Sequence, residues 1–301
     1  MNRRTFLHTT TLAAVSAAYA ADSRKLHIAS NTYPWGTFAK RAGKDFVQHT
    51  DELFAAIAST GITGYEPNIR AIAEFDGLAQ RLQKHGLEMR SLYVNSLLHD
   101  AEAAKTSIAS ALDVARKAAE IGVKIIVTNP APIRWGGPED KTDVQLLTQA
   151  ASLNQLGGEL KKLGITLAYH NHDSELRQGA REFHHMLTAT DAELVKFCLD
   201  AHWIFRGCGD SQVALFDAIG HYGSRVIELH LRQSVSGKWG EVFTAEGDID
   251  HPRLKAWLDQ HGMKPHLVLE QAVETGSPDT QDVVAAHQQS IKNAAALFAG
   301  W

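Results

Sequence analysis

Four segments of this chain end an apolar run with side chains that can bind a metal or move a proton. Segment 169–172 reads Tyr-His-Asn-His, and its two imidazoles stand at i and i+2, on one side of an extended chain. Segment 198–202 (Cys-Leu-Asp-Ala-His) repeats this spacing with a carboxylate. Segments 228–232 (Glu-Leu-His-Leu-Arg) and 267–270 (Leu-Val-Leu-Glu) also close apolar runs with ionisable groups.

His170, Asp200, His230 and Glu270 together form a mixed nitrogen and oxygen donor set without a thiolate. Such a set suits a divalent ion of the Mn, Mg, Fe, Co or Zn type rather than a cysteine-rich structural zinc. Each histidine alone is better explained by an ordinary buried or surface imidazole. Because the four residues end four successive apolar runs, we interpret them as a candidate metal site.

The elements that must position these residues follow one repeated local pattern. An amphipathic helical stretch ends in glycine, and a short apolar run follows at once, as at Gly61, Gly86, Gly122, Gly164 and Gly262. The residue after a helix often takes a left-handed conformation, which glycine adopts without strain. Near-continuous apolar strands that alternate with helices indicate a parallel sheet covered by helices.

Eight strand candidates end near polar or ionisable residues and recur about every 34 residues, a spacing that suits βα units. The strand ends fall at Asn31, Glu66, Asn95, Asn129, His170, Asp200, His230 and Glu270. We therefore predict the α/β class, as a single (β/α)8 (TIM) barrel with its active site at the carboxyl ends of the strands. The alternative is a doubly wound sheet, but no Gly-x-Gly-x-x-Gly motif follows the first strand.

The chain resembles the xylose isomerase-like TIM barrels, a family of sugar phosphate isomerases and epimerases, over essentially all of residues 25–300. This family includes tagatose and psicose epimerases and inosose-processing enzymes. The resemblance is carried by motifs in a fixed order: Gly64-Tyr65-Glu66, Tyr169-His170-Asn171-His172, Leu199-Asp200, His230-Leu231-Arg232, Gly247-Asp248-Ile249-Asp250 and Leu269-Glu270. The resemblance implies a small-molecule carbohydrate as substrate. It also implies one divalent metal ion bound by His170, Asp200, His230 and Glu270, with Mn²⁺ as the first choice and Mg, Co, Fe or Zn as alternatives.

The chain departs from this family at strand 5, where the epimerases have glutamate and this sequence has His170. In the epimerases, the glutamates of strands 5 and 8 flank the substrate and move a proton. A histidine here makes a one-base reaction more plausible, in which a proton is removed next to a carbonyl and a β substituent is then lost. It also removes a negative charge from the metal shell and so strengthens the ion as a Lewis acid.

The resemblance implies an enediolate reaction on a keto sugar, for which Glu270, Glu66 and His172 are candidate bases. Arg232 is a candidate for holding an oxyanion, although a surface arginine explains it equally well.

Further strand-end side chains are candidates for substrate binding: Asn31, Asn95, Asn129, His202 and Trp239. Trp239 is one of four tryptophans just beyond strand ends, with Trp35, Trp135 and Trp203. Aromatic faces suit the C–H faces of sugars, although ordinary packing accounts for each tryptophan as well.

Our first functional hypothesis is a metal-dependent isomerase or epimerase of a keto sugar. The second is a lyase or dehydratase of a keto sugar or 3-keto-glycoside, and the third is a sugar-binding barrel without catalysis. Product analysis separates the first two, because isomerisation leaves the mass unchanged whereas elimination releases water or an aglycone.

Composition and charge limit the remaining classes. With 44% apolar and 21% charged residues, the chain is neither disordered nor fibrous. Its 30 basic residues against 34 acidic ones create no basic field, so we expect no nucleic-acid partner and no stable membrane insertion. A homo-oligomer and a disulfide between Cys198 and Cys208 are both compatible with the sequence.

Residues 1–20 predict an export signal, followed by the barrel over 21–301. Arg3-Arg4 precedes an apolar run from Leu12 to Ala18, and the small residues around Ala20 suit a signal peptidase. The string Asn2–Leu7 resembles a twin-arginine motif, with an ordinary secretory signal as the alternative. We therefore expect a periplasmic or otherwise exported protein, which favours a non-phosphorylated sugar.

Overall fold

A computed structural model describes residues 26–301, and in it eight parallel strands form a nearly closed barrel. The hydrogen-bonded order is β2-β1-β10-β7-β6-β5-β4-β3, and isolated bridges from Gly64 to Glu88 and from Asn68 to Tyr93 join β2 to β3. The strands are β1 (Ile28–Asn31), β2 (Gly64–Glu66), β3 (Ser91–Tyr93), β4 (Ile125–Thr128), β5 (Thr166–His170), β6 (Val195–Asp200), β7 (Val226–Leu231) and β10 (His266–Leu269). The predicted (β/α)8 barrel is confirmed.

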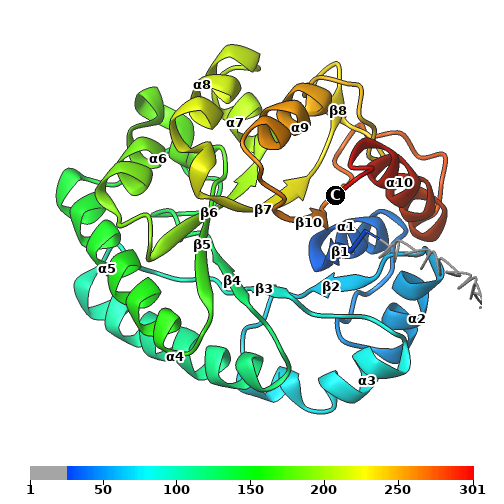
Figure 1. Cartoon of the computed structure of the whole chain (residues 1–301), viewed down its shortest axis with the longest axis horizontal. Helices are drawn as coiled ribbons and strands as arrows, with labels where there is room; N and C mark the ends of the chain where they lie inside the picture. The colour runs from blue at the N-terminus through cyan, green and yellow to red at the C-terminus, as the bar shows by residue number, and fades with distance from the viewer. Residues whose placement is uncertain (1–25) are drawn as a thin grey trace, which may run out of the picture.

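Helices surround the strands (Figure 1). They are α1 (Thr32–Arg41), α2 (Asp51–Ser59), α3 (Leu78–Lys84), α4 (Ala101–Glu120), α5 (Asp143–Lys162), α6 (Arg177–Ala189), α7 (Ala201–Gly207), α8 (Gln212–Tyr222), α9 (His251–Gln260) and α10 (Val283–Leu297). Many begin at a side-chain cap: Thr50, Asp100, Thr142 and Asp282 each accept a hydrogen bond from a backbone N–H of the first turn, which satisfies a donor that the helix leaves unpaired.

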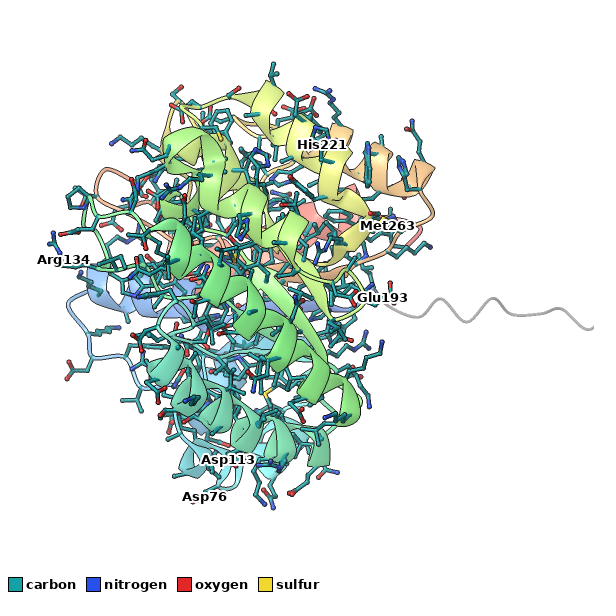
Figure 2. The ribbon with its side chains drawn as sticks, turned by 90° about the vertical axis from the view of Figure 1, so that its left-hand side faces the viewer. Asp76, Asp113, Arg134, Glu193, His221 and Met263 are labelled. Carbon is teal, nitrogen blue, oxygen red and sulfur yellow. The ribbon has the colours of Figure 1, made fainter. Side chains whose placement is uncertain are left out.

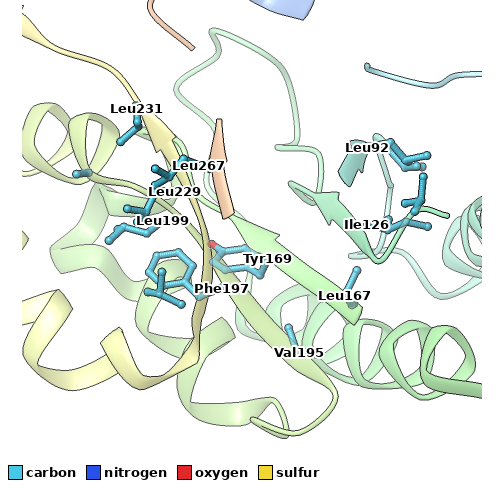
Figure 3. Packing of buried hydrophobic residues seen from close by; sticks show 14 of the residues in the cluster. Leu92, Ile126, Leu167, Tyr169, Val195, Phe197, Leu199, Leu229, Leu231 and Leu267 are labelled. Atoms are coloured by element: carbon cyan, nitrogen blue, oxygen red, sulfur yellow. The ribbon is translucent and has the colours of Figure 1, made fainter. Parts of the chain in front are cut away.

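The two-residue period of the strands divides their side chains between two environments. On β5, Leu167 and Tyr169 point outward into the core between strands and helices, whereas Ala168 points into the barrel. Figure 3 shows Tyr169 beside Phe197 of β6, and their ring centroids are 6.3 Å apart. Because His170 follows the alternation of Ala168, it also faces the barrel interior, and the same logic holds on β6, β7 and β10.

The carboxyl ends of the strands lie together at one end of the molecule. In Figure 2, Arg134, in the segment after β4, lies at the opposite end from Glu193 and Met263, which precede β6 and β10. A small hairpin of β8 (Ser234–Val235) and β9 (Lys238–Trp239), which the sequence did not predict, extends the segment after β7.

Three further predictions meet different outcomes. The export signal over residues 1–20 lies outside the described residues and stays a prediction. Within residues 26–301, no helix has the length and apolarity needed to cross a membrane. Cys198 is buried and Cys208 half-buried, and both are free thiols.

Candidate active site

The four predicted metal ligands come together at the carboxyl end of the barrel. One donor atom from each of His170, Asp200, His230 and Glu270 lies within 4.8 Å of the others, and all four residues are buried. Strand register explains this meeting: the Cα of Asp200 pairs with that of His230 across β6 and β7, and Glu270 directly follows the pairing of β10 with β7. One candidate donor therefore comes from each of β5, β6 and β7, and the fourth, Glu270, directly follows β10.

Unpaired donor atoms show that this set fits a metal ion. Neither ring nitrogen of His170 has a hydrogen-bond partner, and neither does Oδ2 of Asp200, although these atoms are buried. Oδ1 of Asp200 accepts a bond from the Trp203 backbone N–H at 3.1 Å, which fixes the carboxylate and leaves Oδ2 free, 3.9 Å from Nε2 of His170. Buried polar atoms are costly without partners, so an ion held by oxygen and nitrogen donors suits this arrangement.

His230 is held on both sides of its ring. Its Nδ1 lies 2.9 Å from Oε2 of Glu270, and its Nε2 lies 3.1 Å from Oε2 of Glu66 and 3.3 Å from Oε1 of Glu228. Asn31 donates a hydrogen bond of 2.8 Å to the same Oε2 of Glu66. Carboxylates behind a ligating histidine fix its tautomer and ring orientation, so Glu66 and Glu228 occupy supporting positions.

Burial and neighbouring charges set the ionisation of the carboxylates. Burial opposes the charge of Glu270, but Arg232 and His230 outweigh it and lower the pKa of Glu270 to about 2. Burial raises the pKa of Asp200 to about 6 despite the partly compensating charge of Arg232. Burial, together with the carboxylate of Glu66, raises the pKa of Glu228 to about 8. The three carboxyl groups of this buried cluster therefore differ in pKa.

Burial favours the neutral form of two imidazoles, His170 at the end of β5 and His172 just beyond it. Burial, with help from the neighbouring His230, lowers the pKa of His170 well below 6.5, and burial lowers that of His172 to about 4. Their ring centroids are 4.8 Å apart. The backbone N–H of His172 donates to Oε2 of the buried Glu175 at 2.7 Å, which fixes the chain where it leaves β5.

Arg232 is buried and keeps free donors. Its Nη2 lies 2.9 Å from Oε2 of Glu270, while Nε and Nη1 have no hydrogen-bond partner. The guanidinium carbon lies 4.5 Å from the ring centroid of Trp239 and 5.1 Å from that of Trp203. Aromatic faces and a carboxylate thus hold the cation in place, and a substrate oxygen is a suitable partner for its free N–H groups.

A cavity of about 810 Å³ opens above these groups. Of the predicted site residues, six line it: Asn31, Asn95, His170, His172, Arg232 and Glu270. Six others are not among its lining residues: Glu66, Asn129, Asp200, His202, His230 and Trp239. Half-buried Trp203 and exposed Trp135 also line the cavity.

The side chains predicted to bind substrate differ in their surroundings. Asn31 is bonded to Glu66, and Asn129 donates to the His170 carbonyl at 3.0 Å. Asn95 is exposed two residues beyond the end of β3 and donates to Asn68 at 3.3 Å. These placements make Asn95 the most accessible of the three asparagines.

His202 and Trp239 are buried and are not among the residues that line the cavity. His202 packs against Trp203 and Trp239 with ring centroids 5.8 Å from each, and neither of its ring nitrogens has a hydrogen-bond partner. Burial, with Arg232 and Arg206 nearby, lowers the pKa of His202 to about 2. Both residues thus stand behind Arg232 and Trp203 rather than at the cavity wall.

Sequence reasoning missed three residues of the site. Glu228 stands two residues before His230, a spacing that already placed it on the same face of β7. Glu175 follows His172 by three residues, but no pattern in the sequence indicated its hydrogen bond to that backbone N–H. Tyr33 lines the cavity from the first turn of α1, directly after β1.

Comparisons with known proteins place the chain in a family. The family model described as xylose isomerase-like TIM barrel matches residues 37–294, so the chain belongs to this family. The fold resembles that of a sugar phosphate isomerase/epimerase from Parabacteroides distasonis, with TM-score 0.72, 18% identity and coverage of 95% of this chain and 98% of that one.

Two further structures and one curated protein are similar. For 3-keto-D-glucoside 4-epimerase from E. coli, the TM-score is 0.67 at 15% identity, covering 89% of this chain and 98% of that one. For D-psicose 3-epimerase from Clostridium cellulolyticum H10, it is 0.68 at 14% identity, covering 90% and 99%. An inosose dehydratase of Geobacillus kaustophilus is 22% identical over 194 residues, which are 60% of this chain and 61% of that protein's length.

The proteins to which this chain is similar include sugar epimerases and a dehydratase, and its own described residues form a buried donor set beside a cavity. One ionised carboxylate, Glu270, and one neutral imidazole, His172, both reach the cavity. Such a pair can move a proton on a bound substrate, while Arg232 offers N–H donors to an oxygen.

Proposed function

We propose that this protein is a metal-dependent isomerase or epimerase of a keto sugar that removes a proton from a carbon next to the carbonyl. The observation that carries the proposal is the position of Glu270. Its carboxylate belongs to the four-residue donor set, contacts Arg232 at 2.9 Å and lines the cavity. A base, a cation and part of the candidate metal site would therefore face a molecule bound in the cavity.

His170, Asp200, His230 and Glu270 would hold the ion, with Mn²⁺ as the favoured species. When bound, a divalent ion supplies Lewis acidity that polarises a carbonyl oxygen and steadies an enediolate. Glu66 and Glu228 hold His230 from behind, so that its Nδ1 stays directed toward Glu270.

Glu270 takes the proton from the substrate carbon, and Arg232 donates its free N–H groups to the oxygen on which negative charge develops. His172 reaches the same cavity as a neutral imidazole, with its Nδ1 unpaired. It is suited to return a proton to the substrate, on the neighbouring atom or on the other face.

The second candidate is a lyase, and the imidazole of His170 favours it. Of the described residues that line the cavity, the carboxylates are Glu270 and the exposed Asp173. With one carboxylate base at the floor, the electrons left by proton removal form a carbon–carbon double bond. The bond to the β oxygen breaks, and that oxygen takes a proton and leaves as water or as an alcohol. A sugar-binding barrel without turnover is the third candidate.

Proton exchange and product mass test these candidates together. Protein stripped with a chelator and reloaded with Mn²⁺ is incubated in D₂O with a panel of keto-hexoses and keto-glycosides. We expect deuterium at a carbon next to the carbonyl in recovered sugar of otherwise unchanged mass, and none with Glu270→Gln. Products lacking water or the aglycone identify a lyase, whereas saturable sugar binding without any exchange rules out catalysis.

We also propose that residues 1–20 direct export, by the twin-arginine route. A fusion of residues 1–25 to a reporter that is active only after export tests this assignment. Arg3→Lys/Arg4→Lys should retain the reporter inside the cell, and export unaffected by this change would point to an ordinary secretory signal.

A further inference from the structure

We propose that the natural substrate is a keto-glycoside with an apolar, aromatic aglycone, whose sugar ring lies on the cavity floor while the aglycone rests at the mouth. This inference rests on the proposed function and adds the substrate class. It follows from the depth of the cavity, from the side chains around its opening and from the charges near it.

The reactive groups occupy only the floor of the cavity. His170, Arg232 and Glu270 are buried there, whereas Trp135, which lines the same cavity, is 58% exposed and Tyr33 is 49% exposed. The volume of about 810 Å³ lies in the upper part of the range for pockets that take drug-sized ligands, roughly 300–1,000 Å³. A single sugar ring is much smaller, so a floor-bound ring leaves the outer part of the cavity unfilled.

Two exposed aromatic side chains, Tyr33 and Trp135, line the cavity, and we call them the rim. Four further exposed hydrophobic residues lie in segments at the same end but are not among the lining residues: Val47, Ile72, Leu97 and Ile133. Exposed aromatic side chains at a pocket suit the planar face of a ligand. The segment after β4 that carries Trp135 lies at the end of the molecule marked by Arg134 in Figure 2.

The indole of Trp135 connects the rim with the cavity floor through its contact with His172. Its ring centroid lies 5.3 Å from that of His172, whose own ring is 4.8 Å from His170. A planar group beside the indole would therefore continue directly from a sugar ring held at the metal donors. Stacking on the indole would therefore stabilise an aromatic aglycone.

Lys40 and Arg70 also line the cavity, and both are exposed. A phosphorylated sugar would place its charge near these cations, and this is the main alternative to an apolar aglycone. Substitution of Trp135 should weaken binding of an aryl glycoside, whereas substitution of Lys40 and Arg70 should weaken binding of a phosphorylated sugar.

The test measures binding and exchange for three probes on Mn²⁺-loaded protein: a free 3-keto-hexose, its p-nitrophenyl glycoside and a keto-hexose 6-phosphate. We expect the aryl glycoside to bind more tightly than the free sugar, with Trp135→Ala weakening it about three- to tenfold and Trp135→Phe restoring most of the loss. Leu147→Ala, an exposed apolar residue of α5 outside the cavity, is the matched control and should change nothing.

The outcomes separate this inference from the proposed function. Equal binding of aryl glycoside and free sugar, with exchange intact, overturns the aglycone and leaves the enzyme. Preference for the phosphate, lost in Lys40→Ala/Arg70→Ala, also overturns it. Exchange absent with every probe defeats the proposed function, and Trp135-dependent binding of the glycoside would then still support the ligand class. A change of molecular mass in Trp135→Ala by analytical ultracentrifugation would assign the rim to a second copy of the chain and overturn the proposal.

Discussion

Oε2 of Glu66 lies 3.1 Å from Nε2 of His230, on the side of the imidazole opposite to Glu270. The two residues come from β2 and β7, which are separated in the sheet by β1 and β10. They meet because both side chains point into the barrel interior. A buried carboxylate behind a candidate ligand fixes the nitrogen that faces the metal.

Glu66→Gln should weaken divalent-metal binding about 10- to 100-fold, because the amide lacks the charge that supports His230. Titration of chelator-stripped protein with Mn²⁺ or Co²⁺ measures the affinity directly. Glu88→Gln, a change at an exposed glutamate that precedes β3, is the control. An unchanged affinity in Glu66→Gln would show that Glu66 does not support the site.

His230→Ala/Glu270→Ala should abolish stoichiometric metal binding, because it removes two of the four donors. Elemental mass spectrometry of the purified protein should find about one divalent ion per chain before substitution and a trace afterwards. His221→Ala/Glu193→Ala changes the same residue types at exposed positions and should keep the metal. Equal metal content in both double variants would place the ion elsewhere.

His170→Glu should tighten divalent-metal binding and shift any elimination toward epimerisation, since it adds a second carboxylate at the cavity floor. The substitution exchanges one buried donor for another on β5. Product ratios from a keto-glycoside, measured by mass spectrometry, report the shift, and His170→Gln separates the effect of charge from that of shape. A product ratio equal in all three proteins would argue against a role for this position in the choice of reaction.

Stability should fall in acid partly through His287, a buried histidine of α10 stacked on Trp35 with ring centroids 4.5 Å apart. Burial lowers its pKa to about 4, although its hydrogen bond to the Val283 carbonyl opposes the shift. Between pH 6.5 and 4 the unfolded chain binds a proton at this site and the folded chain does not, so unfolding is favoured as the pH falls. The loss should be roughly 2–3 kcal/mol by pH 4.5.

Urea unfolding at pH 7.5 and 4.5 tests this effect. His287→Phe should reduce the stability difference between the two pH values by that amount, whatever it does to stability at pH 7.5. His221→Phe, at an exposed position, is the matched control. An unaltered pH difference in His287→Phe would mean that other groups cause the acid sensitivity.

The barrel could be predicted because local rules suffice for it. Glycines after helices and apolar runs of strand length mark each βα unit, and the observed strand β10 (His266–Leu269) ends one residue before the predicted strand end at Glu270. Near Asn95 the prediction was less accurate, because β3 ends at Tyr93 and the chain leaves the sheet before the asparagine. The β8–β9 hairpin was not predicted, since its pairing depends on contacts with Asp248 that lie outside the hairpin.

The sequence by itself determined which side chains stand at the carboxyl ends of the strands, because the two-residue period of a strand and the parallel direction of all eight strands follow from local pattern. Only the tertiary structure decided what each side chain does there. Closure of the barrel sets Glu66 behind His230, buries Asp200 beyond the cavity wall and leaves Arg232 and Glu270 facing the cavity. These differences in depth arise from strand register and from packing between residues distant in sequence, and no local pattern encodes them.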